Sequence, residues 1–143
     1  MVMEKELFEL LHEASKSNYS EYLYNVWSTM ALTVGAIGWL LTSDSARGFL
    51  GRNREARYVS MLFVTTIAMI HFLVLFHTQQ QSQEILSLLM DDRYVVSNEI
   101  PEAYFNQYFI PWIWPVTSSV LNGLLFSLLI FFIYKTPKFS RSE

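Results

Sequence analysis

The sequence predicts an all-α integral membrane protein with three transmembrane helices and two short external amphipathic helices. The first observation is composition: 52% of the 143 residues are hydrophobic and 16% are charged, against about 25% charged in soluble domains. The second is that Asp, Glu, Lys and Arg are absent from three runs, residues 22–43, 58–83 and 103–134. The third is that the net charge of the segments outside these runs alternates in sign. A chain of this length is expected to form a single membrane domain.

Each charge-free run is long enough to cross a bilayer. A spanning helix needs about 20 mostly apolar residues to cross a hydrocarbon core of roughly 30 Å. We therefore assign the spans to residues 23–42, 58–77 and 109–134. Helices of a soluble bundle normally keep a charged face with a period of about 3.6 residues, and these runs carry no such face. The pattern favours a membrane protein over a soluble bundle.

The charges outside the spans predict the orientation of the chain. Residues 43–57 and 135–143 each carry a net charge of +2, whereas residues 1–21 carry −3 and residues 78–108 carry −4. Loops rich in Arg and Lys stay in the cytosol. We therefore expect a cytosolic loop at 43–57, a cytosolic tail at 135–143 and an N-terminus outside.

Each external segment is expected to contain a short amphipathic helix. Within residues 1–21, apolar side chains recur at helical spacing between glutamates, as in a helix that lies on a membrane surface. Within residues 78–108, Ser82 is expected to cap a second helix of about three turns, with Ile85 and Leu89 facing inward.

The composition argues against several classes of function. A net charge of −3 provides no basic surface for nucleic acid. The absence of cysteine removes disulfides, thiolate nucleophiles and Cys-ligated metals. The spans contain no carboxylate, Lys or Arg, which the known intramembrane enzymes and transporters use. We therefore expect no enzymatic activity, no metal site and no cofactor held by this chain alone.

Small and polar residues within the spans are the candidate functional residues. Gly35 and Gly38 in the first span would let another helix approach closely. In the third span Ser119, Gly123 and Ser127 recur every four residues, beside a polar stripe of Ser118 and Asn122. Helix packing is the favoured interpretation of these residues. The alternative is a pore, lined by Asn122, Ser118, Ser119, Thr65 and His71.

His71 is the most readily ionised side chain deep within a span. A neutral imidazole can ligate haem, relay a proton or sense pH. The favoured interpretation is a neutral ring that is hydrogen-bonded to Ser, Thr or Asn of a neighbouring helix. Haem held by one chain would want a second His at similar depth on another span, and neither other span has one. Haem would therefore require a partner chain.

Three stretches of the sequence resemble the motifs of a known family of membrane proteins. Residues 20–27 run from Ser-Glu-Tyr to Trp, residues 64–71 read Val-Thr-Thr-Ile-Ala-Met-Ile-His, and residues 108–115 run from Tyr to Pro around Trp112. Together they resemble the first three helices of microbial rhodopsins, especially the proteorhodopsin-like group. The second stretch is similar to that family's Val-Thr-x-Ile-Ala-x-x-His motif, and the third to its Tyr-x-Asp-Trp-x-x-x-x-Pro motif. The resemblance implies the same outside N-terminus and cytosolic first loop.

The chain also departs from that family. Three of the seven helices are present, no final helix supplies the retinal-binding Lys, and Pro111 stands where the family has its proton-accepting Asp. The segment between the second and third helices is also longer. The resemblance therefore implies a fragment or a repurposed half-barrel, which would meet retinal only through a partner chain.

These observations lead to three functional hypotheses. The first is a small non-catalytic multi-pass protein that acts as an oligomeric or accessory subunit of a membrane complex. Its partners would be the lipid bilayer and either copies of itself or other membrane subunits. The second is a homo-oligomeric ion channel or pore. The third is a rhodopsin-like or haem-type cofactor-binding membrane protein.

Overall fold

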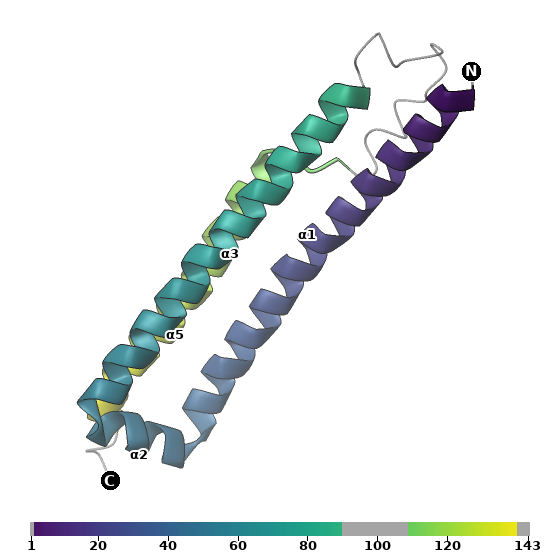
Figure 1. The fold of residues 1–143 in the computed structure, drawn as a ribbon. Coiled ribbons are helices and arrows are strands. Elements are labelled where there is room, and N and C mark those ends of the chain that lie inside the picture. The colour runs from purple at the N-terminus through teal and green to yellow at the C-terminus, as the bar shows by residue number, and fades with distance from the viewer. Residues whose placement is uncertain (1, 90–108, 140–143) are drawn as a thin grey trace.

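Three long helices packed side by side, with a short helix across one end, make up the fold (Figure 1). The computed structural model describes residues 2–89 and 109–139. Their helices are α1 (Val2–Thr42), α2 (Asp44–Arg52), α3 (Arg54–Leu89) and α5 (Ile113–Phe139). The first residues of α1 and the last of α5 lie at opposite ends of the bundle (Figure 1). The predicted all-α class is confirmed for this part of the chain.

Two or three of these helices are long and apolar enough to cross a membrane. Two such stretches are Arg54–Leu88 of α3 and Ile113–Thr136 of α5. α1 reaches that standard only together with α2, from which it is bent by 85°. The expected span at residues 23–42 of α1 contains the polar residues Asn25, Ser28 and Thr29, which lower its hydropathy. The third span expected at 23–42 therefore stays a prediction.

α1 is a single helix of 41 residues. The segment expected to form a separate amphipathic helix within residues 1–21 is helical from Val2, but it continues directly into residues 23–42. No Pro or Gly lies between residues 2 and 34, so the sequence contains no residue that would end the helix at their junction. The expected division of this segment into two helices is not seen.

α3 likewise continues well past its expected end at residue 77. The helix start expected at Ser82 is wrong, because α3 passes through this residue to Leu89. The Ser82 hydroxyl instead accepts a hydrogen bond of 3.1 Å from the backbone N–H of Ile110. This bond fixes the chain just before α5 against α3. The remainder of the expected external helix, residues 90–108, lies outside the described residues.

The loop expected at 43–57 contains a helix that the sequence analysis missed. The Ser43 side chain accepts a hydrogen bond of 3.2 Å from the backbone N–H of Ala46, which caps the start of α2. Asn53 ends α2, and its side chain accepts a 3.0 Å bond from the N–H of Ala56 at the start of α3. Ala46 and Leu50 are buried. α2 therefore lies across the end of the bundle with one apolar face against it.

Two clusters of buried apolar side chains hold the long helices together. The first, called here the outer cluster because it lies toward the start of α1, consists of Tyr22, Val26, Leu75 and Ile110. The second, called the α2-side cluster, consists of Ile37, Leu40, Ala46, Leu50, Leu129 and Ile133. Each cluster joins residues that lie far apart in the sequence. They are the apolar core of the fold.

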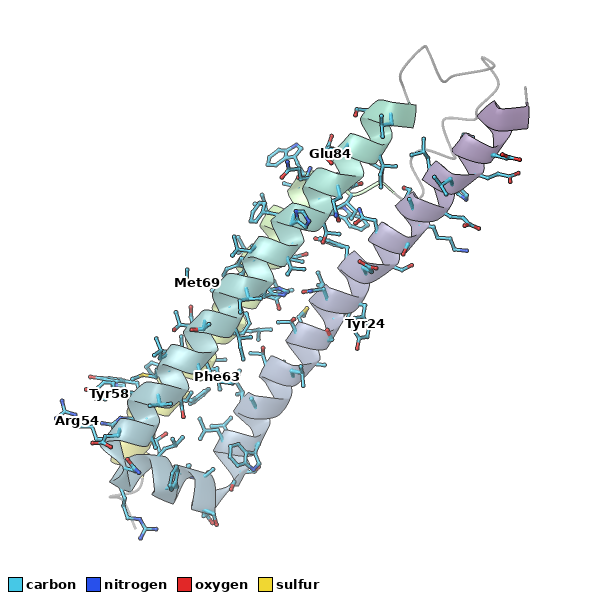
Figure 2. All side chains as sticks on the ribbon, viewed as in Figure 1. Tyr24, Arg54, Tyr58, Phe63, Met69 and Glu84 are labelled. Atoms are coloured by element: carbon cyan, nitrogen blue, oxygen red, sulfur yellow. The ribbon has the colours of Figure 1, made fainter. Side chains whose placement is uncertain are left out.

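Large apolar side chains also cover the outside of the bundle. Tyr24, Trp39, Leu62 and Met69 are all more than half exposed. Figure 2 shows Tyr24 and Met69 pointing away from the neighbouring helices. Water-soluble proteins rarely expose apolar surface so continuously, whereas a helix surrounded by lipid has no reason to bury it. This surface agrees with a membrane protein.

Candidate functional site

A layer of polar side chains lies between the two apolar clusters. Along α1 and α3 its members lie close to the outer cluster, on the side toward the α2-side cluster, and along α5 they lie between Ile110 and Leu129. We call this set the polar layer, and it consists of Asn25 and Thr29 on α1, His71 on α3, and Ser118, Ser119 and Asn122 on α5. Three helices therefore bring their polar residues to one depth of the bundle.

His71 is hydrogen-bonded to α1 through one ring nitrogen. Its side chain is 4% exposed. Nδ1 lies 2.6 Å from Asn25 Oδ1 and 3.1 Å from Thr29 Oγ1. An amide oxygen only accepts hydrogen bonds, so with this oxygen placed toward the ring, Nδ1 carries the proton. In the neutral ring Nε2 is then an acceptor. The expected bonding of His71 to Asn or Thr of a neighbouring helix is confirmed.

Two further hydrogen bonds join α1 to the other helices. The hydroxyls of Tyr22 and Ser118 lie 2.9 Å apart, which links α1 to α5. The side-chain amide of Asn18 donates a 3.0 Å bond to the carbonyl of Thr78, which links α1 to α3. Tyr22 lies just outside the span assigned from the sequence, so its hydroxyl was not considered as a partner for Ser118.

Four buried polar atoms in the polar layer have no hydrogen-bond partner. They are His71 Nε2, Ser119 Oγ and both amide atoms of Asn122. Asn122 is 0% exposed. The aromatic ring of Phe126, one turn further along α5, lies 6.1 Å from the His71 ring between centroids. The polar layer therefore has unused hydrogen-bonding capacity on the side where α3 faces α5.

The small residues predicted for helix packing fall into two groups. A Cβ atom added to Gly123 would lie 3.7 Å from the Phe72 ring, so this glycine packs α5 closely against α3. A Cβ added to Gly35 or Gly38 would meet nothing within 4 Å. Both of these glycines are exposed. Gly123 thus faces a neighbouring helix, whereas Gly35 and Gly38 face the outside of the bundle, although their sequence patterns are alike.

Two predicted residues do not join the polar layer. Ser127, which follows Gly123 in the predicted stripe, is exposed. Thr65 is also exposed, and its hydroxyl donates to the carbonyl of Met61 in its own helix. Thr65, which the pore hypothesis groups with Asn122, therefore lies apart from the buried polar residues of this chain.

The chemistry of the polar layer is that of amides, hydroxyls and one imidazole. Within residues 2–89 and 109–139, no three His, Asp or Glu side chains come together as a metal site would require. The groups present can donate and accept hydrogen bonds. They can hold helices in register or hold a small polar partner.

Comparison with known proteins adds no relative. No protein-family model, curated protein or solved structure matches this chain. The resemblance to microbial rhodopsins stays a prediction.

Replacing Asn25 by leucine is expected to destabilise the bundle by about 1 kcal/mol, because His71 Nδ1 loses its shorter hydrogen bond. The measurement is reversible unfolding in detergent micelles. In a His71→Leu background the same substitution is expected to have little effect, because the bond is already absent. Equal effects in both backgrounds would show that the two side chains are not coupled.

Proposed function

We propose that this chain is a non-catalytic three-span membrane protein that works as a subunit of an oligomer or of a larger membrane complex. The observation that carries the proposal is a face of α1 that we call the small-residue face, made of Ala31, Gly35, Gly38 and Thr42. All four residues are exposed. Their spacing of three or four residues places them on one side of the helix.

The small-residue face is suited to a second transmembrane helix. It lies opposite the buried side of α1, where Thr33, Ile37 and Leu40 pack into the bundle. Small residues let two helix backbones approach closely, and this contact is a main source of helix association in lipid. Apart from the adjoining turns of α1 itself, nothing in the described chain lies within 4 Å of a Cβ built on Gly35 or Gly38. A partner helix would find the face open.

The proposed orientation has the N-terminus outside and the C-terminus in the cytosol, with residues 23–42 of α1 as the third span. Arginines gather at the α2 end of the bundle, at positions 47, 52, 54 and 57. Such residues favour the cytosolic side. The opposite placement of the first residues of α1 and the last of α5 agrees with an odd number of crossings (Figure 1).

The pore hypothesis receives less support from the geometry. A pore between copies of this chain needs polar side chains on the outer surface of each copy. Of the residues expected to line it, His71 and Asn122 are buried inside one bundle. Thr65 is exposed and lies on the same helix as His71. Ion flux through liposomes, lost in Asn122→Leu, would instead support the pore.

The cofactor hypothesis rests on His71, whose Nε2 is free of a protein partner. That atom lies inside the bundle, however, where a planar haem would have to separate packed helices to reach it. The cofactor hypothesis therefore requires a partner chain that helps to bind the cofactor. Visible absorbance of the purified protein would support it.

The proposal is tested by the mass of the protein purified in mild detergent. We expect the protein mass of the wild-type particle to correspond to two or more copies of the 16.7 kDa chain, or the particle to contain a second polypeptide. We expect the Gly35→Leu, Gly38→Leu double variant to be reduced to a single chain, because two leucines block close approach at the small-residue face.

The matched control is Thr66→Leu, which also adds a leucine at an exposed position but on α3. It is expected to leave the particle mass unchanged. A wild-type protein that is already a single chain, or a double variant with the wild-type mass, would count against the proposal.

A further inference from the structure

The four unpartnered polar atoms of the polar layer belong to α3 and α5, two helices that pack against each other at this depth. His71 Nε2 lies on α3, whereas Ser119 Oγ and the amide of Asn122 lie on α5. Residues 119, 122 and 126 recur at helical spacing and so share one side of α5. Phe126 on that side lies against the His71 ring, with centroids 6.1 Å apart. The next residue after Asn122, Gly123, approaches Phe72, which follows His71.

Apolar side chains are packed toward both ends of the bundle from these atoms. The outer cluster lies on one side and the α2-side cluster on the other. The one hydroxyl of the outer cluster, on Tyr22, already pairs with Ser118. An unpaired polar group in such surroundings is strongly unfavourable. Buried groups of this kind in native proteins are normally paired with protein atoms or with ordered water.

From these contacts we infer that the polar layer is a binding site for water, which bridges His71 Nε2 to Asn122 and Ser119 and so joins α3 to α5. Because Nδ1 carries the proton toward Asn25, Nε2 requires a donor. The Asn122 amide offers two N–H donors and one acceptor, and the Ser119 hydroxyl can donate or accept. One water molecule can donate to Nε2 and accept from the amide. A buried water typically has about three such partners.

The chemical groups of the polar layer favour water over an ion as the bound ligand. No carboxylate lies within the polar layer, so a cation would have no compensating charge. An anion would meet the acceptor Nε2. This inference does not depend on the proposed function, because it concerns the inside of one chain and not the small-residue face.

The test is a solid-state NMR measurement of the protein in lipid bilayers. A His12→Gln, His77→Gln variant leaves His71 as the one imidazole of the chain, so ¹⁵N-labelled histidine reports on it alone. We expect its Nδ1 to be protonated and its Nε2 to be unprotonated. We expect magnetisation to pass from water protons to the His71 ring and the Asn122 amide at least several-fold faster than to Phe126 or Leu129.

Two results would overturn the inference. One is the absence of transfer from water to the His71 ring beyond the level of Leu129. The other is a scalar coupling between Asn122 Nδ2 and His71 Nε2, which would show that the two side chains bond directly with no water between them.

A pair of variants at Asn122 extends the test. Asn122→Leu fills the site with apolar volume and is expected to reduce transfer to His71 to the level of Leu129. Asn122→Ser keeps a hydroxyl and leaves room for water, so transfer is expected to persist. Rapid transfer that persists in Asn122→Leu contradicts the inference. If that variant does not fold, the measurement on the protein with native Asn122 decides the question. The particle mass tests the proposed function separately.

Discussion

Replacing Gly123 by leucine is expected to lower the stability of the bundle by about 1–3 kcal/mol, because the added side chain must displace packed neighbours. A Cβ at this position would already be in van der Waals contact with the Phe72 ring, at 3.7 Å, so the remaining atoms of leucine would press against that ring. Reversible unfolding in detergent micelles measures the effect. The aromatic contact between Phe72 and Phe126, with centroids 6.3 Å apart, would be disturbed as well.

The control for this prediction is Ser127→Leu, one turn further along the same helix. Ser127 is exposed, so the added leucine meets lipid or detergent and is expected to change stability little. Equal losses at the two positions would mean that Gly123 does not pack against α3 as described.

Replacing Leu75 by alanine is expected to have the largest effect on stability, about 2–5 kcal/mol. The Leu75 side chain is 0% exposed and lies in the outer cluster with Tyr22, Val26 and Ile110. Its removal leaves a cavity whose lining atoms lose their contacts. The same unfolding measurement in micelles checks the size of the loss.

Leu73 provides a matched control, because it has the same side chain on the same helix but is 70% exposed. Leu73→Ala is expected to change the free energy of unfolding by no more than about 0.5 kcal/mol. A loss at Leu73 as large as the loss at Leu75 would contradict the assignment of the two faces of α3.

The positions of the long helices could be predicted from the absence of charge alone. Among the described residues, the runs without Asp, Glu, Lys or Arg fall within α1, α3 and α5 except at residues 43 and 109–112. The helix ends were predicted less well. α1 and α3 continue beyond the expected spans, because residues 2–34 and 52–100 contain no Pro or Gly. Charged residues end a span without ending a helix.

α2 was not predicted, because residues 43–57 were assigned as a cytosolic loop on the basis of their net positive charge. Ser43 is a common capping residue, and Ala46 and Leu50 are four residues apart on one face. Those signals were present in the sequence. They were outweighed by the four arginines, which predicted only on which side of the membrane the segment lies.

The facing direction of the small and polar residues could not be predicted. Gly35, Gly38 and Gly123 belong to similar small-residue patterns, yet Gly123 packs inside the bundle and the other two face outward. A soluble helix reveals its buried side through its apolar residues. In these helices both sides are apolar, so the rotation of each helix depends on contacts that only the folded structure shows. The pairing of His71 with Asn25 is one such contact.

The length of α1 has a mechanical consequence. A helix of 41 residues is about 60 Å long, about twice the roughly 30 Å thickness of the hydrocarbon core. If residues 23–42 are embedded in lipid, the first half of α1 extends beyond the hydrocarbon core as a continuous, rigid helix. The bond from Asn18 to Thr78 joins this half of α1 to α3. A displacement of its tip would therefore act on α3 at Thr78, seven residues along the chain from His71.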